Sequence, residues 1–325
     1  MDMIHIAFCC DNNYLPYCAT VIASILDTNK GEEISFHILC SDSTIDNERK
    51  ITEWLSQYGG KVQAFFEHID EKRFDEFPIG DAYINISTYF RLALPELLPN
   101  VDKVLYLDCD IIVNGCLREL WETDVRDYAM AGVLDRHSGS IRLYNRLGYP
   151  LEYGYVNAGV LLINLKKWRE DHLFEKSLTL ARQKPAHLKN HDQDILNILY
   201  YNQKLILDFK YNLLEYYLFV EDWLYMDRKY YPQIIHACKN PVIIHFCLPV
   251  KPWHFECTNP FKTLYYKYRA MTPWPEVKLT HRKEKLTPKL KVKRLLGRLG
   301  MYHIETKPTL RKDIDVIEEP NNILF

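Results

Sequence analysis

The 325-residue chain is missing the features that mark exported or membrane-spanning proteins. No stretch of about 18 apolar, uncharged residues occurs, so we expect no membrane-spanning helix. The first residues carry no basic segment, and Asp11 interrupts the first apolar run, so we expect no secretory signal. No Gly-x-Gly-x-x-Gly motif follows the first predicted strand, which argues against the usual dinucleotide-binding fingerprint.

Cysteine pairs at short spacing are also missing. The nine cysteines are odd in number and scattered, with no Cys-x-x-Cys motif. This spacing predicts neither a zinc site nor a disulfide framework. Most of the cysteines lie in apolar runs, so we expect reduced, buried thiols in a cytoplasmic protein.

Charge divides the chain into two parts that the overall balance of 41 basic and 43 acidic residues conceals. Residues 278–325 carry 12 basic and six acidic residues, whereas residues 1–277 carry 29 and 37. Pro273 and Pro275 mark the junction. We therefore predict a globular domain over residues 1–277 and a basic tail over residues 278–325, whose charge favours a membrane surface or a polyanion.

Short β-rich runs alternate with helical patterns along the first domain. Strands are predicted at residues 4–10, 34–40, 62–66 and 101–107, and helices at residues 14–29, 46–58 and 87–94. This order predicts an α/β fold with a mostly parallel sheet flanked by helices. Ligands of such sheets bind beyond the carboxyl ends of the strands, so residues just after each strand are the first candidates for a site.

Two carboxylates and a histidine follow apolar strands. Asp108 and Asp110 come after one strand, and extended backbone would place both on the same side. Their oxygens suit Mg²⁺ or Mn²⁺, whereas the alternative is a solvated loop with two surface acids. His245 ends another apolar strand, and Lys251 follows in a Pro-rich loop. Together they would form a metal-centred diphosphate clamp, although a lone histidine in an apolar strand is more often a core residue.

The turn at residues 11–14, Asp-Asn-Asn-Tyr, stands where the first strand meets a helix. Amide and carboxylate edges there can bind a base, and the Tyr14 ring can stack on one. The alternative is a helix N-cap, for which Asp and Asn are common choices.

Six ordered motifs resemble glycosyltransferase family 8, which includes bacterial lipopolysaccharide galactosyl- and glucosyltransferases and, more distantly, glycogenin. They lie at residues 11–14, 87–92, 103–121, 157–169, 192–197 and 245–253, and the resemblance covers residues 1 to about 270. It implies a GT-A fold and retaining transfer of a hexose from UDP-galactose or UDP-glucose to a glycan or lipid-linked acceptor. It also implies a role in the synthesis of lipopolysaccharide or another cell-surface polysaccharide.

The resemblance assigns roles to individual residues. The implied ligands of Mn²⁺, with Mg²⁺ as the alternative, are Asp108, Asp110 and His245. Lys251 would contact the diphosphate. The residues that would bind uracil and ribose are Cys9 (through its backbone), Asp11, Asn13 and Tyr14. Those that would surround the donor hexose are Arg91, Asn157, Asp192 and Gln193, with Asp135 on the sugar or acceptor side.

Gln193, Asp192 and Asn157 are the implied catalytic residues. Gln193 lies where a nucleophile would be expected, but an amide is a poor nucleophile, so we favour same-face attack through a short-lived oxocarbenium ion. Two positions depart from the family pattern, because Asn12 stands where Asp is usual and Leu248 where Gly is frequent.

Residues 281–298 of the tail hold eight basic residues and one acidic residue, with leucines that would give a helix an apolar side. This composition predicts a helical tail on an anionic membrane surface, and hence a cytoplasmic protein peripheral to the inner face of the plasma membrane. A charged helix packed on the body is the alternative. We expect no nucleic acid partner, because the body is acidic.

Two other functions compete with the transferase. A phosphatase of the haloacid dehalogenase type also has an apolar strand followed by Asp-x-Asp, but near its N-terminus and with a later acidic pair that this chain does not have. A nucleotide- or glycan-binding scaffold without turnover is the non-enzymatic alternative.

Overall fold

The computed structural model describes residues 2–79, 85–219 and 226–282. The predicted tail at residues 278–325 lies almost wholly outside the described residues, and so do its expected helix and leucine face. Among the described residues, no helix has both the length and the apolar composition needed to cross a bilayer.

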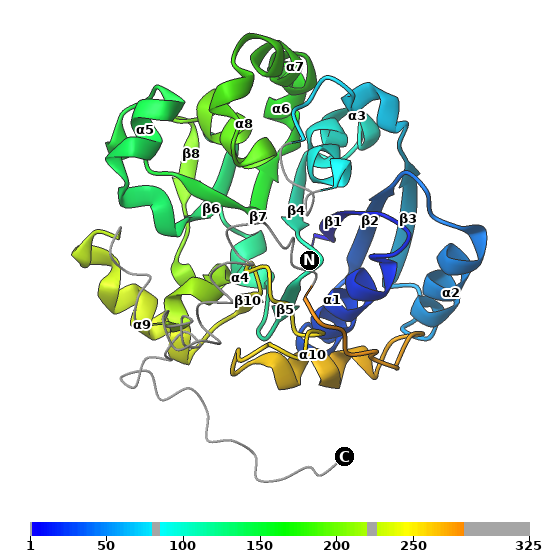
Figure 1. Cartoon of the computed structure of the whole chain (residues 1–325). Helices are drawn as coiled ribbons and strands as arrows, with labels where there is room; N and C mark the ends of the chain where they lie inside the picture. The colour runs from blue at the N-terminus through cyan, green and yellow to red at the C-terminus, as the bar shows by residue number, and fades with distance from the viewer. Residues whose placement is uncertain (1, 80–84, 220–225, 283–325) are drawn as a thin grey trace, which may run out of the picture.

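A seven-stranded sheet forms the centre of the domain (Figure 1). Its strands are β1 (Ile4–Cys10), β2 (Ile34–Cys40), β3 (Val62–His68), β4 (Lys103–Leu107), β6 (Met130–Leu134), β7 (Val156–Asn164) and β8 (Lys204–Ile206). Their order is β3-β2-β1-β4-β7-β6-β8. All neighbouring pairs are parallel except those that β7 makes with β4 and β6, so the prediction of a mostly parallel sheet is confirmed.

Both faces of this sheet are buried, as the continuous apolar runs predict. Helices α1 (Leu15–Thr28), α2 (Ile45–Ser56) and α10 (Lys262–Arg269) cover one face (Figure 1). On the other face lie α3 (Leu94–Leu97), α6 (Leu165–Glu170), α7 (Leu173–Gln183) and α8 (His191–Leu199). In β1 the alternation is clear, because Ile6 and Phe8 join the first apolar core and Ala7 joins the second.

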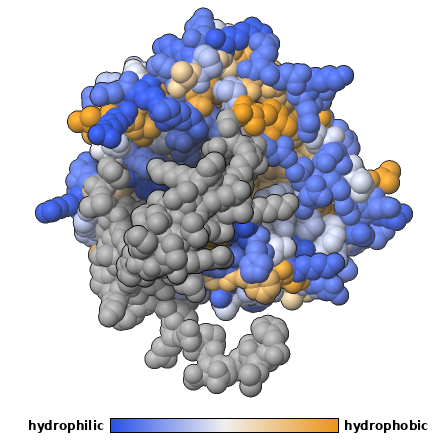
Figure 2. Space-filling view, viewed as in Figure 1, coloured by the Kyte–Doolittle hydropathy of each residue, from blue (hydrophilic) through white to orange (hydrophobic). Residues whose placement is uncertain are grey.

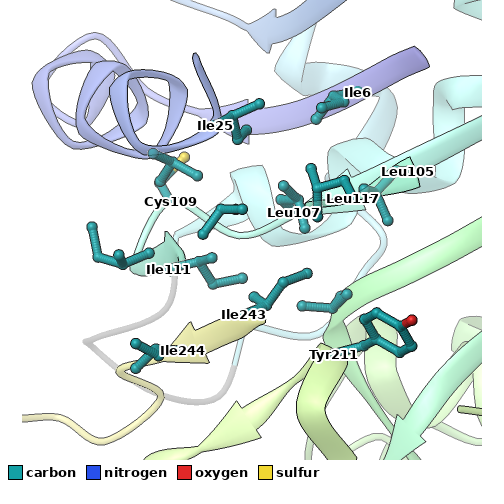
Figure 3. Packing of buried hydrophobic residues seen from close by; sticks show 14 of the residues in the cluster. Ile6, Ile25, Leu105, Leu107, Cys109, Ile111, Leu117, Tyr211, Ile243 and Ile244 are labelled. Carbon is teal, nitrogen blue, oxygen red and sulfur yellow. The ribbon is translucent and has the colours of Figure 1, made fainter. Parts of the chain in front are cut away.

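A second, three-stranded sheet has the order β5-β10-β9. Its strands are β5 (Ile111–Val113), β9 (Leu213–Leu214) and β10 (Ile243–His245). The chain leaves β4 of the large sheet, turns at Cys109 and Asp110, and enters β5 of the small one. Figure 3 shows the apolar packing at this junction, where Ile111 and Ile243 of the small sheet lie on the side that faces Leu107 of the large one.

The helix expected at residues 87–94 is confirmed, as a 3-10 helix, Ile86–Ala93, followed by the short α3. One local prediction is wrong. The segment with Asp108 and Asp110 is a turn rather than extended backbone. Aspartate favours turns because its short carboxylate bonds to nearby backbone groups, and here the turn carries the chain from one sheet to the other.

The remaining helices are α4 (Arg118–Trp121), α5 (Ile141–Leu147) and α9 (Tyr231–Lys239). All nine cysteines are free, and six are buried, while Cys116 is exposed and Cys9 and Cys247 are half-buried. The face seen in Figure 2 is mostly hydrophilic, with separate apolar patches.

Candidate active site

Three candidate metal ligands converge where the two sheets meet. The Asp108, Asp110 and His245 side chains each place one ligand atom within 4.8 Å of the others. His245 Nε2 lies 3.2 Å from Asp110 Oδ1 and 3.8 Å from Asp108 Oδ2. Pairing explains the convergence, because antiparallel β10 sets His245 opposite Ile111, the residue that follows the turn.

The orientation of the His245 ring suits a metal. Its Nδ1 lies 3.0 Å from Asn212 Oδ1, and the Asn212 amide nitrogen donates to Asn157 Oδ1 at 2.9 Å. Asn212 therefore accepts the Nδ1 proton and leaves the Nε2 lone pair facing the two carboxylates. Electron-rich atoms that face one another at this distance repel unless a cation joins them, so the donor set fits a divalent ion.

Gly159 in β7 forms the floor of this group. Its carbonyl oxygen accepts the Asp108 backbone N–H at 2.9 Å. A methyl group added at Gly159 would overlap the His245 ring and lie 2.7 Å from Asp108 Oδ2. Only glycine permits the strand and the ligands to approach this closely.

Lys251 lies beside the triad. Its ammonium donates to Asp110 Oδ2 at 2.5 Å and to the Phe246 carbonyl oxygen at 2.6 Å. Burial alone would raise the pKa of the Asp110 carboxyl, but the Lys251 ammonium opposes this effect, and that pKa is well below its usual range. The site therefore holds a carboxylate and an ammonium side by side, which suits a metal-bound phosphate.

Arg91 links two acids on the other side of Asp108. It is 3% exposed, donates to Asp108 Oδ1 at 3.0 Å, and places Nε 3.0 Å from Asp192 Oδ2. Thr88 donates to the other Asp192 oxygen at 2.6 Å. Burial raises the pKa of Asp192, although Arg91 opposes the rise. Asp192 is thus a buried acid whose charge is balanced by a guanidinium.

Gln193, Asn157 and Asp135 form one hydrogen-bonded group. Gln193 Oε1 accepts from the Ala158 backbone N–H at 2.9 Å and from Asn157 Nδ2 at 3.2 Å. Asp135 Oδ2 accepts from Asn157 at 3.3 Å and from Gln193 Nε2 at 3.4 Å. Because Asn157 also binds Asn212, these residues connect to His245 through amide contacts.

The N-terminal turn reaches the same edge of the sheet. Tyr14 is 41% exposed, and partial burial raises its pKa to about 12, an effect that Lys251 opposes and Asp110 reinforces. Asp11 accepts the Tyr14 backbone N–H at 2.9 Å and an Asn85 amide hydrogen at 2.7 Å. Asp11 therefore stabilises the turn, but it does not cap α1 as the N-cap alternative predicts, because the N-cap residue is Tyr14 and no side chain caps the helix. Asn13 and Tyr14 remain exposed.

Cys9, in β1 before this turn, is half-buried, and its carbonyl oxygen accepts from the Cys109 thiol at 3.8 Å.

The two departures from the family pattern have local contacts. Asn12 Oδ1 accepts from the Thr44 backbone N–H at 3.1 Å and from Asn47 Nδ2 at 3.0 Å. Asn12 thus ties the first turn to the start of α2. Leu248 is half-buried in the loop before Lys251.

Sequence reasoning missed four positions. Gly159 had a signal, since a glycine inside an apolar strand marks a close approach. Asn212 had none. Half-buried Arg146 forms an ion pair at 2.6 Å with the fully buried Asp194, to which Tyr155 also donates at 2.7 Å. That pair fixes α5 against α8, the helix that carries Asp192 and Gln193.

Comparison with known proteins identifies the family. The model of glycosyl transferase family 8 matches residues 5–257. A lipopolysaccharide 1,2-glucosyltransferase of Escherichia coli is 30% identical over 91% of this chain and 86% of its own. A lipopolysaccharide 1,3-galactosyltransferase of Salmonella typhimurium is 27% identical over 84% and 80%. The crystal structure of the galactosyltransferase LgtC with donor and acceptor sugar analogs is 30% identical, with a TM-score of 0.74 over 83% of this chain and 96% of that one.

Proposed function

The chain belongs to glycosyl transferase family 8 and has the GT-A fold, and from this premise we propose that it transfers galactose or glucose from the corresponding UDP-sugar to a glycan acceptor. One observation carries the proposal: Asp108, Asp110 and His245 converge within 4.8 Å beside Lys251. Two oxygen donors, one imidazole and one ammonium suit a metal-bound diphosphate, the leaving group of such a donor.

Mn²⁺ is the proposed metal, with Mg²⁺ as the alternative. The imidazole ligand favours Mn²⁺, because Mg²⁺ prefers oxygen and water. When bound, the ion would stabilise the negative charge that develops on departing UDP. Lys251 would hold the diphosphate from the other side, and Asn212 would keep the His245 ring in its ligating orientation.

The donor would lie across the edge where β1, the 108–110 turn and β7 meet. Tyr14, Asp11 and Asn13, with the Cys9 backbone, are the proposed contacts to uracil and ribose. Arg91, Asp192 and Asn157 are the proposed contacts to the hexose, with Asp135 on the sugar or acceptor side. Arg91 supports this assignment because it already binds the metal-site carboxylate Asp108 and lies against Asp192.

Retention of configuration is proposed to occur by same-face attack. A double displacement needs a free nucleophile, and neither candidate side chain offers one. Gln193 Oε1 accepts two hydrogen bonds, and Asp192 is held by Arg91 and Thr88. We assign Gln193 a role beside the anomeric carbon, where its amide would orient the sugar. A Gln193→Ala protein with wild-type turnover would contradict that role.

The acceptor class follows from the relatives. Two of those named above are lipopolysaccharide transferases by name, so a glycan of the cell surface is the proposed acceptor. Family membership counts against a phosphatase of the haloacid dehalogenase type. A scaffold without turnover is disfavoured by the intact ligand set.

Release of UDP tests the proposal. The full chain is incubated with a panel of UDP-sugars, with Mn²⁺ or with EDTA, in the absence of acceptor. We expect slow release from one UDP-hexose that EDTA abolishes. UDP binding without release from any donor would support the scaffold until an acceptor restored turnover, and no UDP binding would contradict the proposal.

Attachment to the inner face of the cytoplasmic membrane rests on the basic composition of residues 281–298 alone. We expect the full chain, but not a chain ending at residue 277, to pellet with vesicles that contain anionic phospholipid. A truncated chain that pelleted equally well would refute the attachment.

A further inference from the structure

A cluster of thiols lies directly behind the proposed metal site. Cys10 ends β1, Cys18 lies in α1, and Cys109 occupies the 108–110 turn. Their three sulfur atoms lie within 4.8 Å of one another. Cys18 is fully buried, and Cys10 and Cys109 are 2% and 8% exposed. Figure 3 shows Cys109 beneath α1, close to Ile25 and away from the small sheet's Ile244.

We propose that Cys10, Cys18 and Cys109 bind one thiophilic divalent cation of the zinc class, at a site distinct from the carboxylate–histidine site. Zinc–sulfur bonds of about 2.3 Å place ligand sulfurs about 3.8 Å apart in a tetrahedral site. The three thiols therefore need to move inward by no more than about 1 Å. Binding replaces the thiol protons, which pass to solvent, and the Cys109 thiol gives up its contact with the Cys9 carbonyl.

Cys40 is the candidate for the fourth position. Parallel pairing of β1 and β2 sets Cys40 beside Cys10, so the two side chains project to the same face of the sheet. Its thiol donates to Asp42 Oδ1 at 3.5 Å and is 1% exposed. Three or four sulfur ligands from separate elements would explain why no linear cysteine motif appears in the sequence.

Sulfur chemistry separates this site from its neighbour. Thiolates prefer zinc, whereas carboxylate oxygens with one imidazole suit manganese or magnesium. A disulfide would use two of the three thiols and leave the third unpaired. Simple packing of small apolar thiols is the competing explanation. A cation would additionally join the 108–110 turn to β1 and α1, and so stabilise the fold.

Zinc content tests the site. The full chain is produced with zinc and reductant, and bound metal is counted by elemental analysis and by native mass. Cys18→Ala and Cys18→Ser remove a central ligand. Cys238→Ala is the matched control, because Cys238 is equally buried but lies in α9. His245→Ala tests whether zinc sits in the carboxylate–histidine site instead. Cobalt substitution of the wild-type chain reports sulfur ligation directly, through its sulfur-to-cobalt charge-transfer absorption.

We expect one equivalent of zinc in the wild-type, Cys238→Ala and His245→Ala proteins, and its loss in both Cys18 variants. The cobalt form of the wild-type chain should show sulfur-to-cobalt absorption. A wild-type protein that holds no zinc, or a cobalt form without that absorption, overturns the proposal and leaves packing as the explanation. Zinc retained in the Cys18 variants but lost from His245→Ala overturns it as well. These results do not depend on transferase activity.

Discussion

The 108–110 turn presents its side chains to two contrasting environments. Asp108 and Asp110 have 29% and 16% of their side chains exposed and face His245. Cys109, between them, is 8% exposed and faces Cys10 and Cys18 in the apolar core. One turn therefore supplies charged ligands to an open site and a thiol to a closed one.

The contrast shows how the fold compensates charge. On the open side, Arg91 and Lys251 donate to the two carboxylates. On the closed side, thiols tolerate burial because neutral cysteine behaves as a small apolar residue. Substitutions on the open side should therefore change the reaction, and those on the closed side should change stability.

The largest effect is expected at Asp110. Asp110→Asn removes a charged ligand and the partner of Lys251, so UDP release should fall by about 10³-fold or more. Steady-state release at saturating Mn²⁺ measures it, with Cys238→Ala as the control that keeps its rate. An Asp110→Asn protein as active as the wild type would contradict the expectation that substitutions on the open side change the reaction.

Glu215 also feels the charge of Lys251, but its pKa is raised, whereas the pKa of Asp110 is lowered. Burial raises the pKa of Glu215 to about 7, although Asn259 and Lys251 oppose the rise. The folded state therefore holds this proton more tightly than the unfolded state, and the stability that it contributes is present below about pH 4.5 and lost as pH rises to about 7. The difference is about 3 kcal/mol as an order of magnitude.

Denaturant unfolding at several pH values measures this effect. Glu215→Gln should unfold with a flatter dependence on pH between 5 and 7 than the wild type, and should be the more stable of the two at pH 8. An unchanged slope would mean that Glu215 is ionised in the folded protein throughout.

Gly159 tests the floor of the open side. Gly159→Ala places a methyl group against His245 and Asp108, so the ligands must shift, and UDP release should fall by about 10²-fold. Gly60→Ala is the matched control, because an added methyl group meets no atom within 4 Å there. Equal rates for the two variants would contradict the packing described for Gly159.

The closed side should give the smallest effect on the rate. Cys18→Ala leaves a small cavity and should lower the free energy of unfolding by about 1–2 kcal/mol in metal-free protein. Denaturant unfolding with and without added zinc measures it, and zinc should stabilise the wild type but not the variant. A loss of UDP release as large as that of Asp110→Asn would show that the two sides are not separable.

Asp108 and Asp110 could be identified as candidates from sequence, because they follow the apolar strand β4 of the large sheet. His245 ends β10 of the small sheet, and it meets the two carboxylates only through the pairing of β10 with β5. The strands at residues 4–10 and 34–40 were predicted with their observed bounds. The turn at residues 108–110 was not, since period-2 alternation describes extended backbone and carries no information on a passage between two sheets.

The closed side could not be predicted from spacing. Cys10, Cys18 and Cys109 meet only because β1 pairs with β4 and α1 packs beside their carboxyl ends. Asn212 likewise reaches His245 through the pairing of β9 with β10. Such contacts depend on strand pairing between distant segments, which local patterns do not specify.

Binding of Mn²⁺ in the presence of UDP tests the central claim most directly. Electron paramagnetic resonance of free Mn²⁺ during titration counts the bound ion in the wild-type, His245→Ala and Cys18→Ala proteins. We predict one UDP-dependent Mn²⁺ site in the wild type that persists in Cys18→Ala and is lost or strongly weakened in His245→Ala. Binding to His245→Ala as tight as to the wild type would contradict the assignment of the metal site.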